Sequence, residues 1–206
     1  MRLLEQLGEE TEALHVVIDG DVRRLLDSAT AEDYRCYVVQ LYGFVAPLER
    51  AILKTPDLAQ SIDVRRFQKH ELLRRDLSAL RMTADEIAGL AECAIPQLGT
   101  PEEALGWAYP IERSTLGHSD LFRRLAAVIP GEVAFASSYL KASFGAVGET
   151  WRSFGSALEV FEDTPRRAQP VIASAKASYH CLRAWRVLHE TRSVMRVPRV
   201  SRRQHA

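Results

Sequence analysis

The chain has 206 residues, of which 47% are hydrophobic and 26% are charged, a balance typical of globular proteins and unlike that of disordered ones. Its 27 basic and 27 acidic residues cancel, so no overall field draws it toward nucleic acid or an anionic membrane. Cys36, Cys93 and Cys181 are far apart in sequence and form no CxxC pair, which argues against a disulfide framework and a thiolate zinc site. No apolar run suits a membrane span or a signal peptide. We therefore expect a cytoplasmic protein that binds neither nucleic acid nor membrane.

Helical spacing of apolar residues predicts the elements of the first half of the chain. The first helix presents one face made of Leu7, Thr11, Leu14, His15, Ile18, Val22 and Leu25. Thr30 and Asp33 resemble an N-terminal cap, from which a second helix extends to about Lys54. A highly charged third segment covers about 64–80. The first helix thus carries a histidine on its apolar side.

Two capping boxes predict the next helix starts, one formed by Thr83 with Glu86 and the other by Thr100 with Glu103. The second of these helices should extend from Pro101 to about Leu125. Pro110 lies inside it, and we expect a kink there because proline removes a backbone hydrogen bond.

Shorter helices are expected over 133–143 and 149–161, followed by a long last helix over 168–191. No segment alternates with period two between hairpin turns, so no sheet is expected. The predicted fold is all-α, a single-domain bundle of several helices over residues 1–191, with a basic, disordered tail over 192–206.

Motifs for several common chemistries are missing from the chain. It has no GxGxxG, phosphate-loop, HExxH or GxSxG sequence, and its six histidines form no cluster. Glu112 and His118 are six residues apart, which is the wrong spacing for a di-iron bundle. A single histidine facing the interior still suffices for heme, which asks the protein for as little as one axial imidazole. Taken alone, His15 is a weak candidate, because a lone histidine on an apolar face is more often a core or boundary residue.

The segment 7–18 resembles the first helix of heme oxygenases in Thr11, Leu14 and His15. In that family, the matching histidine is the proximal iron ligand, so the resemblance implies His15 as the metal ligand. The segment 106–118 is similar to the distal-helix motif of the bacterial members. The positions that agree are Gly106, Trp107, Tyr109, Glu112, Ser114, Leu116 and Gly117. A third segment, 172–183, is similar to a late helix whose basic residues meet the heme propionates.

The resemblance implies a heme-oxygenase-like fold and heme, with its iron, as cofactor and substrate. It implies cleavage to biliverdin, carbon monoxide and iron, with electrons from a ferredoxin or a reductase, and a bilin-accepting protein as a further partner. The catalytic residues it implies are Ser114, Gly117 and Arg113. The residues it implies for heme binding, besides His15, are Thr11, Tyr109, Glu112, Leu116, His118, Tyr179 and Arg183.

The chain also departs from the family pattern. Arg113 and His118 replace two glycines of the distal motif, and Gly8 occupies a position where many relatives have a basic residue for a propionate. Arg113 either extends outward and leaves the oxygen site open or fills the distal pocket. His118 is either a sixth iron ligand or, the interpretation we favour from its helical position, a surface residue on the polar flank.

These departures keep two other functions open. One is a heme- or bilin-binding protein of the same fold that lacks oxygenase activity. The other is a bundle that shares only its fold with proteins acting on thiamin or quinone precursors. For that third function we expect interior carboxylates and cysteines, and the sequence shows no such cluster.

Overall fold

The computed structural model describes residues 2–27, 29–162 and 165–195, and every regular element in these ranges is helical. The predicted all-α class is therefore confirmed. Among the described residues, none of the helices has the length and apolar content that a membrane span requires. The basic tail expected over 192–206 lies outside the described residues from 196 on, and before that the last helix continues to Met195.

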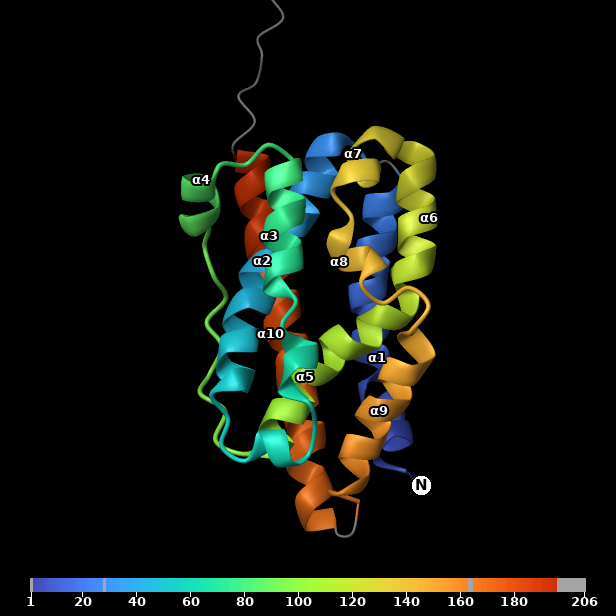
Figure 1. Ribbon diagram of the computed structural model, residues 1–206, viewed down its shortest axis with the longest axis vertical. Helices are drawn as coiled ribbons and strands as arrows, with labels where there is room; N and C mark the ends of the chain where they lie inside the picture. The colour runs from blue at the N-terminus through green and yellow to red at the C-terminus, as the bar shows by residue number, and fades with distance from the viewer. Residues whose placement is uncertain (1, 28, 163–164, 196–206) are drawn as a thin grey trace, which may run out of the picture.

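The elements follow the chain in a simple order, and Figure 1 shows how they are arranged. They are α1 (Leu3–Asp27), α2 (Ala31–Leu53), two 3-10 turns (Leu58–Gln60 and Val64–Phe67), α3 (His70–Ala79), α4 (Ala84–Ala88), α5 (Pro101–Ser114), the 3-10 turn η3 (Thr115–Gly117), α6 (His118–Val128), α7 (Pro130–Phe135), α8 (Ser138–Lys141), α9 (Val147–Glu159) and α10 (Pro165–Met195). The long helix α10 extends along the bundle behind α5 (Figure 1). Helices α2 and α3 lie on one side of α10, and α1, α6 and α9 lie on the other.

The helix starts agree in part with their sequence signals. Thr30 with Asp33 and Thr83 with Glu86 form complete capping boxes. The box expected at Thr100 is incomplete, because the Glu103 carboxylate accepts from the backbone N–H of Gly99 instead of Thr100. Two predicted segments are divided: 64–80 into a 3-10 turn and α3, and 133–143 into the end of α7 and α8.

The predicted helix from Pro101 to Leu125 breaks later than expected. It continues through Pro110, ends at Ser114, and resumes as α6 after η3. The hydroxyls of Ser114 and Thr115 donate to the carbonyls of Ile111 and Glu112, both at 2.7 Å, and so compete with the backbone at the end of α5. This break sends α5 and α6 in different directions (Figure 1).

Close packing of α5 on α10 forms the centre of the core. A Cβ atom added to Gly106 would lie 2.6 Å from the Cβ of Ser174, so only glycine allows this approach. The buried Ser178 hydroxyl donates to the carbonyl of Trp107 at 2.9 Å. The contact fixes the distance between the helix that carries the distal motif and the last helix.

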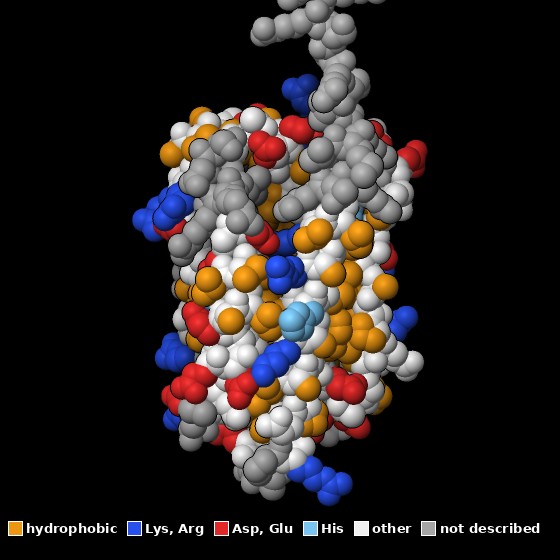
Figure 2. Space-filling model, turned by 180° about the vertical axis from the view of Figure 1, so that it is seen from behind, with side chains coloured by type: hydrophobic (Ala, Val, Ile, Leu, Met, Phe, Trp, Pro, Cys, Tyr) orange, Lys and Arg blue, Asp and Glu red, His pale blue; other side chains and the backbone are white. Residues whose placement is uncertain are grey.

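The described part of the chain contains no disulfide, although the fold brings two cysteines together. The sulfur atoms of Cys93 and Cys181 lie 3.3 Å apart, and burial raises the pKa of the Cys93 thiol to about 12. On the face seen from behind, acidic, basic and hydrophobic side chains are interspersed, with no field of one sign (Figure 2).

Candidate functional site

A cavity of about 300 Å³ lies between α1 and the segment from α5 to α6, at the lower end of the range of about 300–1,000 Å³ for small-molecule pockets. Its other walls come from α2 and α10. The lining residues are His15, Ile18, Asp19, Val22, Tyr37, Leu41, Pro110, Ile111, Arg113, Ser114, Leu116, Gly117, His118, Asp120, Leu121, Tyr179, Leu182 and Arg186. Half of these lining residues are apolar and half are polar or charged, so the cavity can bind a ligand that has both apolar and polar parts.

His15 lies on the α1 wall with its side chain 20% exposed. Its Nε2 is 3.3 Å from a carboxylate oxygen of Asp19, and its Nδ1 is 3.5 Å from the hydroxyl of Tyr179. Burial lowers the pKa of His15 and the charge of Arg113 lowers it further, against the opposing charges of Asp19 and Glu12. The imidazole is therefore neutral near pH 7, the form that binds a metal.

Arg113 takes neither of the two courses expected from the sequence. It lines the cavity, but its guanidinium reaches across to α1, where it donates to Glu12 at 2.7 Å and to the hydroxyl of Tyr109 at 3.0 Å. A Cβ atom added to Gly8 would lie 3.8 Å from this guanidinium. The cation therefore occupies the space beside Gly8, where a basic side chain is missing from α1.

His118 is buried, so the surface position favoured from the sequence is wrong. Its side chain lines the cavity, its ring packs on Tyr139 with centroids 5.1 Å apart, and its Nδ1 is 3.4 Å from the Ser143 hydroxyl. Burial lowers its pKa to about 4, with a further decrease from Lys69 and an opposing increase from Glu112. The error arose because the helix restarts at His118, which changes the direction that its side chain takes.

Gly117, Ser114, Leu116 and Tyr179 also line the cavity. A Cβ atom added to Gly117 would meet nothing within 4 Å, which leaves open space on this wall. Tyr139, behind His118, has a buried hydroxyl without a hydrogen-bond partner in the described part of the chain.

Four residues implied by the resemblance lie outside the cavity lining. Thr11 is buried and donates to the carbonyl of Leu7 at 2.6 Å, and Tyr109 is a fully buried acceptor for Arg113. Glu112 lies in an ion cluster, and Arg183 is exposed on α10.

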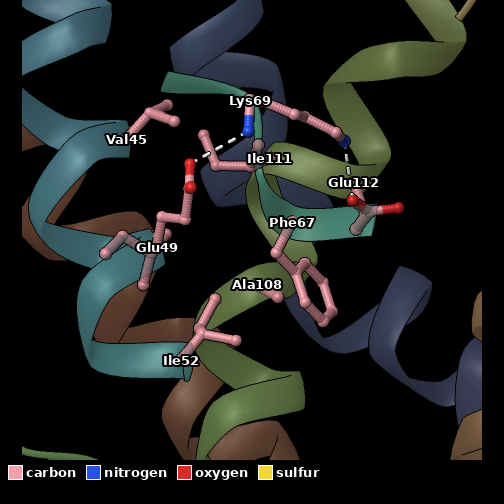
Figure 3. A pocket seen from close by; sticks show the side chains of 9 residues that line it. Val45, Glu49, Ile52, Phe67, Lys69, Ala108, Ile111 and Glu112 are labelled. Carbon is pink, nitrogen blue, oxygen red and sulfur yellow. Dashed lines mark hydrogen bonds and ion pairs between the residues drawn. The ribbon is translucent and has the colours of Figure 1, made fainter. Parts of the chain in front are cut away.

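The Glu112 carboxylate binds Lys69 at 2.8 Å (Figure 3). It also binds Arg66 at 2.7 Å. Burial opposes its ionisation, but these two cations outweigh burial and lower its pKa. Beside it, Glu49 accepts from the backbone N–H of Lys69 at 2.9 Å (Figure 3) and from that of His70, also at 2.9 Å. The space between these groups is only about 20 Å³, enough for about one water molecule, so this cluster joins α2, α3 and α5 and is not a ligand site.

Sequence reasoning missed four polar residues of the cavity: Asp19, Tyr37, Asp120 and Arg186. Arg186 shares a helical face with Tyr179 and Leu182, and this i, i+3, i+7 spacing was the signal that could have found it in place of Arg183. The described residues contain no group of three or more His, Cys, Asp or Glu side chains placed to hold a metal ion. An iron bound here would need most of its ligands from a cofactor.

Comparisons with known proteins point to one family and one fold. The family model for heme oxygenase matches residues 1–186. Among solved structures, the chain is similar to the NO- and CO-bound heme oxygenase from Neisseria meningitidis, with 19% identity, a TM-score of 0.70, and coverage of 93% of this chain and 92% of that chain. No curated protein sequence matches. The structural match shows a common fold, and the family model covers most of the chain.

Proposed function

Because the chain belongs to the heme oxygenase family, we propose that it binds heme in the cavity beside His15 and cleaves it to biliverdin, carbon monoxide and iron. Membership supports heme degradation as the general function. The observation that carries the specific proposal is a neutral histidine on one wall of a partly apolar cavity, with a glycine that leaves open space on another.

The lining suits heme in three respects. Its apolar side chains match the ring, the His15 imidazole could supply one nitrogen ligand to the iron, and Arg186 could balance a carboxylate. When bound, heme supplies the iron and the redox chemistry, and electrons come from an external donor such as a ferredoxin or a reductase. A bilin-accepting protein is a further proposed partner.

His15 must present an unprotonated Nε2 to bind iron. The proton then resides on Nδ1 and is donated to the hydroxyl of Tyr179, which orients the ring. Asp19, whose side chain is 46% exposed, must turn away from Nε2. Tyr179 is therefore proposed as the residue that sets the tautomer of His15.

On another wall, Gly117 and Ser114 present no charged side chain to the cavity. Gly117 would leave space for the ring, while the hydroxyl of Ser114 donates its proton to the carbonyl of Ile111. The unpartnered Tyr139 hydroxyl lies behind His118 and can hold an ordered water molecule. These groups would orient the bound ring and exclude bulk water, and the cofactor would supply the chemistry.

One observation favours the second candidate, a heme- or bilin-binding protein without turnover. His118 is a buried, neutral imidazole on the same cavity as His15. If both histidines bind the iron, no position remains for oxygen. A low-spin, bis-histidine spectrum would identify this function.

The test begins with titration of the purified protein with hemin. We expect a Soret band that His15→Ala removes or shifts strongly, whereas His180→Ala, a change at an exposed histidine of α10, leaves it unchanged. With ascorbate or a ferredoxin system under air, the complex should yield biliverdin and carbon monoxide. A heme complex that survives this treatment intact would refute turnover, and an unaltered spectrum in His15→Ala would remove His15 as the ligand.

A further inference from the structure

A pair of thiols lies away from the cavity, where the segment 89–100 meets α10. The sulfur atoms of Cys93, in this segment, and Cys181, on α10, are 3.3 Å apart, although the two residues are 88 positions apart in the chain. Neither cysteine belongs to the lining of the cavity beside His15. The proposed heme chemistry therefore gives these two thiols no role.

Tight packing against α2 holds both cysteines in place. The backbone N–H of Cys93 donates to the carbonyl of Gly43 at 2.8 Å. A Cβ atom added to Gly43 would lie 2.6 Å from the ring of Trp185, so α10 also packs directly on α2 at this point. Trp185 is four residues after Cys181, on the same face of α10, and its Nε1 donates to the carbonyl of Gln40 at 2.8 Å. The two sulfur atoms thus face each other because their backbones are fixed.

The two thiols differ in their access to solvent. Cys93 is only 7% exposed, and burial raises the pKa of its thiol to about 12, which keeps it protonated and shielded. Cys181 is partly exposed, so a small oxidant can reach its sulfur. Once Cys181 is oxidised, Cys93 is already in contact with it. The sulfur atoms, now 3.3 Å apart, need to approach by only about 1.3 Å to reach the bond length of about 2.0 Å.

We propose that Cys93 and Cys181 form a reversible disulfide when the protein meets hydrogen peroxide, and that Cys181 is the thiol oxidised first. The Cys181 sulfur attacks one oxygen of the peroxide, the O–O bond breaks, and the thiol proton leaves with the other oxygen as water. The Cys93 sulfur then attacks the sulfur of the resulting sulfenic acid. The S–O bond breaks, and the Cys93 proton leaves with the hydroxyl group as a second water molecule. The two thiols thus give two electrons to the peroxide, and a dithiol reductant reverses the change.

The disulfide fastens an irregular part of the chain to the last helix. Residues 89–100 join α4 to α5 without forming a helix (Figure 1). A bond between residues 88 positions apart restricts the unfolded chain strongly, because it closes a long loop. The oxidised protein should therefore unfold at a higher temperature than the reduced protein.

The test uses the full-length protein, which is reduced, freed of reductant and treated with hydrogen peroxide. Remaining thiols are blocked with N-ethylmaleimide in denaturant, and mass spectrometry of the digested protein identifies the linked residues. The variants are Cys93→Ser and Cys181→Ser. The matched control is Cys36→Ser, which removes a partly exposed cysteine of α2 and leaves the pair intact.

In the wild type and in Cys36→Ser, peroxide should link Cys93 to Cys181, and dithiothreitol should remove the link. The melting temperature of the linked form should exceed that of the reduced form by about 5–10 °C. Neither Cys93→Ser nor Cys181→Ser should show this increase after treatment. In Cys93→Ser, Cys181 should accumulate as sulfenic and sulfinic acid, whereas in Cys181→Ser the buried Cys93 should stay reduced.

Several outcomes would overturn the proposal. Recovery of both Cys93 and Cys181 as blocked thiols after peroxide treatment would show that they do not form a disulfide. A link through Cys36 between two molecules, with the pair still reduced, would place the reactive thiol elsewhere. Oxidation of Cys93 in Cys181→Ser, with Cys181 unreactive in Cys93→Ser, would reverse the order of the two steps. Equal melting temperatures of the linked and reduced forms would refute the stabilisation. No heme enters these measurements, so this proposal and the proposed function stand or fall separately.

Discussion

Gly106 and Gly117 belong to the same distal motif, but the fold uses them in opposite ways. Gly106 is pressed against α10, where an added Cβ atom would lie 2.6 Å from Ser174, whereas one at Gly117 would meet nothing within 4 Å. The first glycine allows two backbones to approach, and the second leaves space for a ligand. One sequence motif therefore combines a packing requirement with a cavity requirement, and stability measurements can separate them.

The largest effect is expected at the packed end. Gly106→Ala should cost about 3 kcal/mol of unfolding free energy, because neither α5 nor the backbone of α10 can move away from the new methyl group. Urea denaturation followed by circular dichroism measures it. Gly20→Ala, inside α1 with open space around it, is the control and should stabilise by about 0.5 kcal/mol. An unfolding free energy of Gly106→Ala equal to that of the wild type would mean that α10 can shift away from the new methyl group at little cost.

Glu112 lies between the two glycines and should show the next largest effect. Glu112→Gln leaves Arg66 and Lys69 without their carboxylate and should cost about 2 kcal/mol at pH 7. Because the pKa of Glu112 is lowered in the folded state, its contribution is present above the unfolded-state pKa and is lost as the pH falls through the folded value. The difference between wild type and variant should therefore shrink in acid. The exposed pair of Glu32 with Arg35 offers a control, Glu32→Gln, with little change expected.

The open end should show a smaller, pH-dependent effect through His118. Its pKa is about 4 when folded and 6.5 in the reference state, so between these values the unfolded chain binds a proton that the folded chain does not. Stability should fall by about 1 kcal/mol from pH 6.5 to 5.5 and level off below about 4. His118→Gln should remove this slope, and the exposed His180→Gln should keep it. An identical slope in His118→Gln would show that His118 does not titrate as a buried group.

The smallest effect on stability is expected at Gly117 itself. Gly117→Ala should change the unfolding free energy of the ligand-free protein by no more than about 0.5 kcal/mol, since the methyl group has no clash to make. Affinity for hemin, measured by absorbance titration, should nevertheless fall, because the methyl group takes space from the cavity. Loss of stability with unchanged affinity would reverse the assignment of the two glycines.

The candidate site could be predicted in part because its residues lie on single helices at regular spacing. His15 was identifiable from the apolar face of α1, and Ser114, Leu116 and Gly117 from one continuous motif. The sequence also predicted Arg113 at the site. It did not predict the direction of the Arg113 side chain, because its partner Glu12 is 101 residues away. Glu112 was misleading for the same reason, because Arg66 and Lys69 come from a different part of the chain.

The sequence by itself determined the helical class, most helix starts and the histidine of the cavity, because these depend on local periodicity and on caps within three or four residues. Only the tertiary structure decided which charges are paired and which are left to a ligand. Glu12 neutralises Arg113 and two cations neutralise Glu112, while Arg186 faces the cavity with a backbone carbonyl as its contact. Charge pairing depends on distances across helices that are far apart in sequence, and no local pattern encodes those distances.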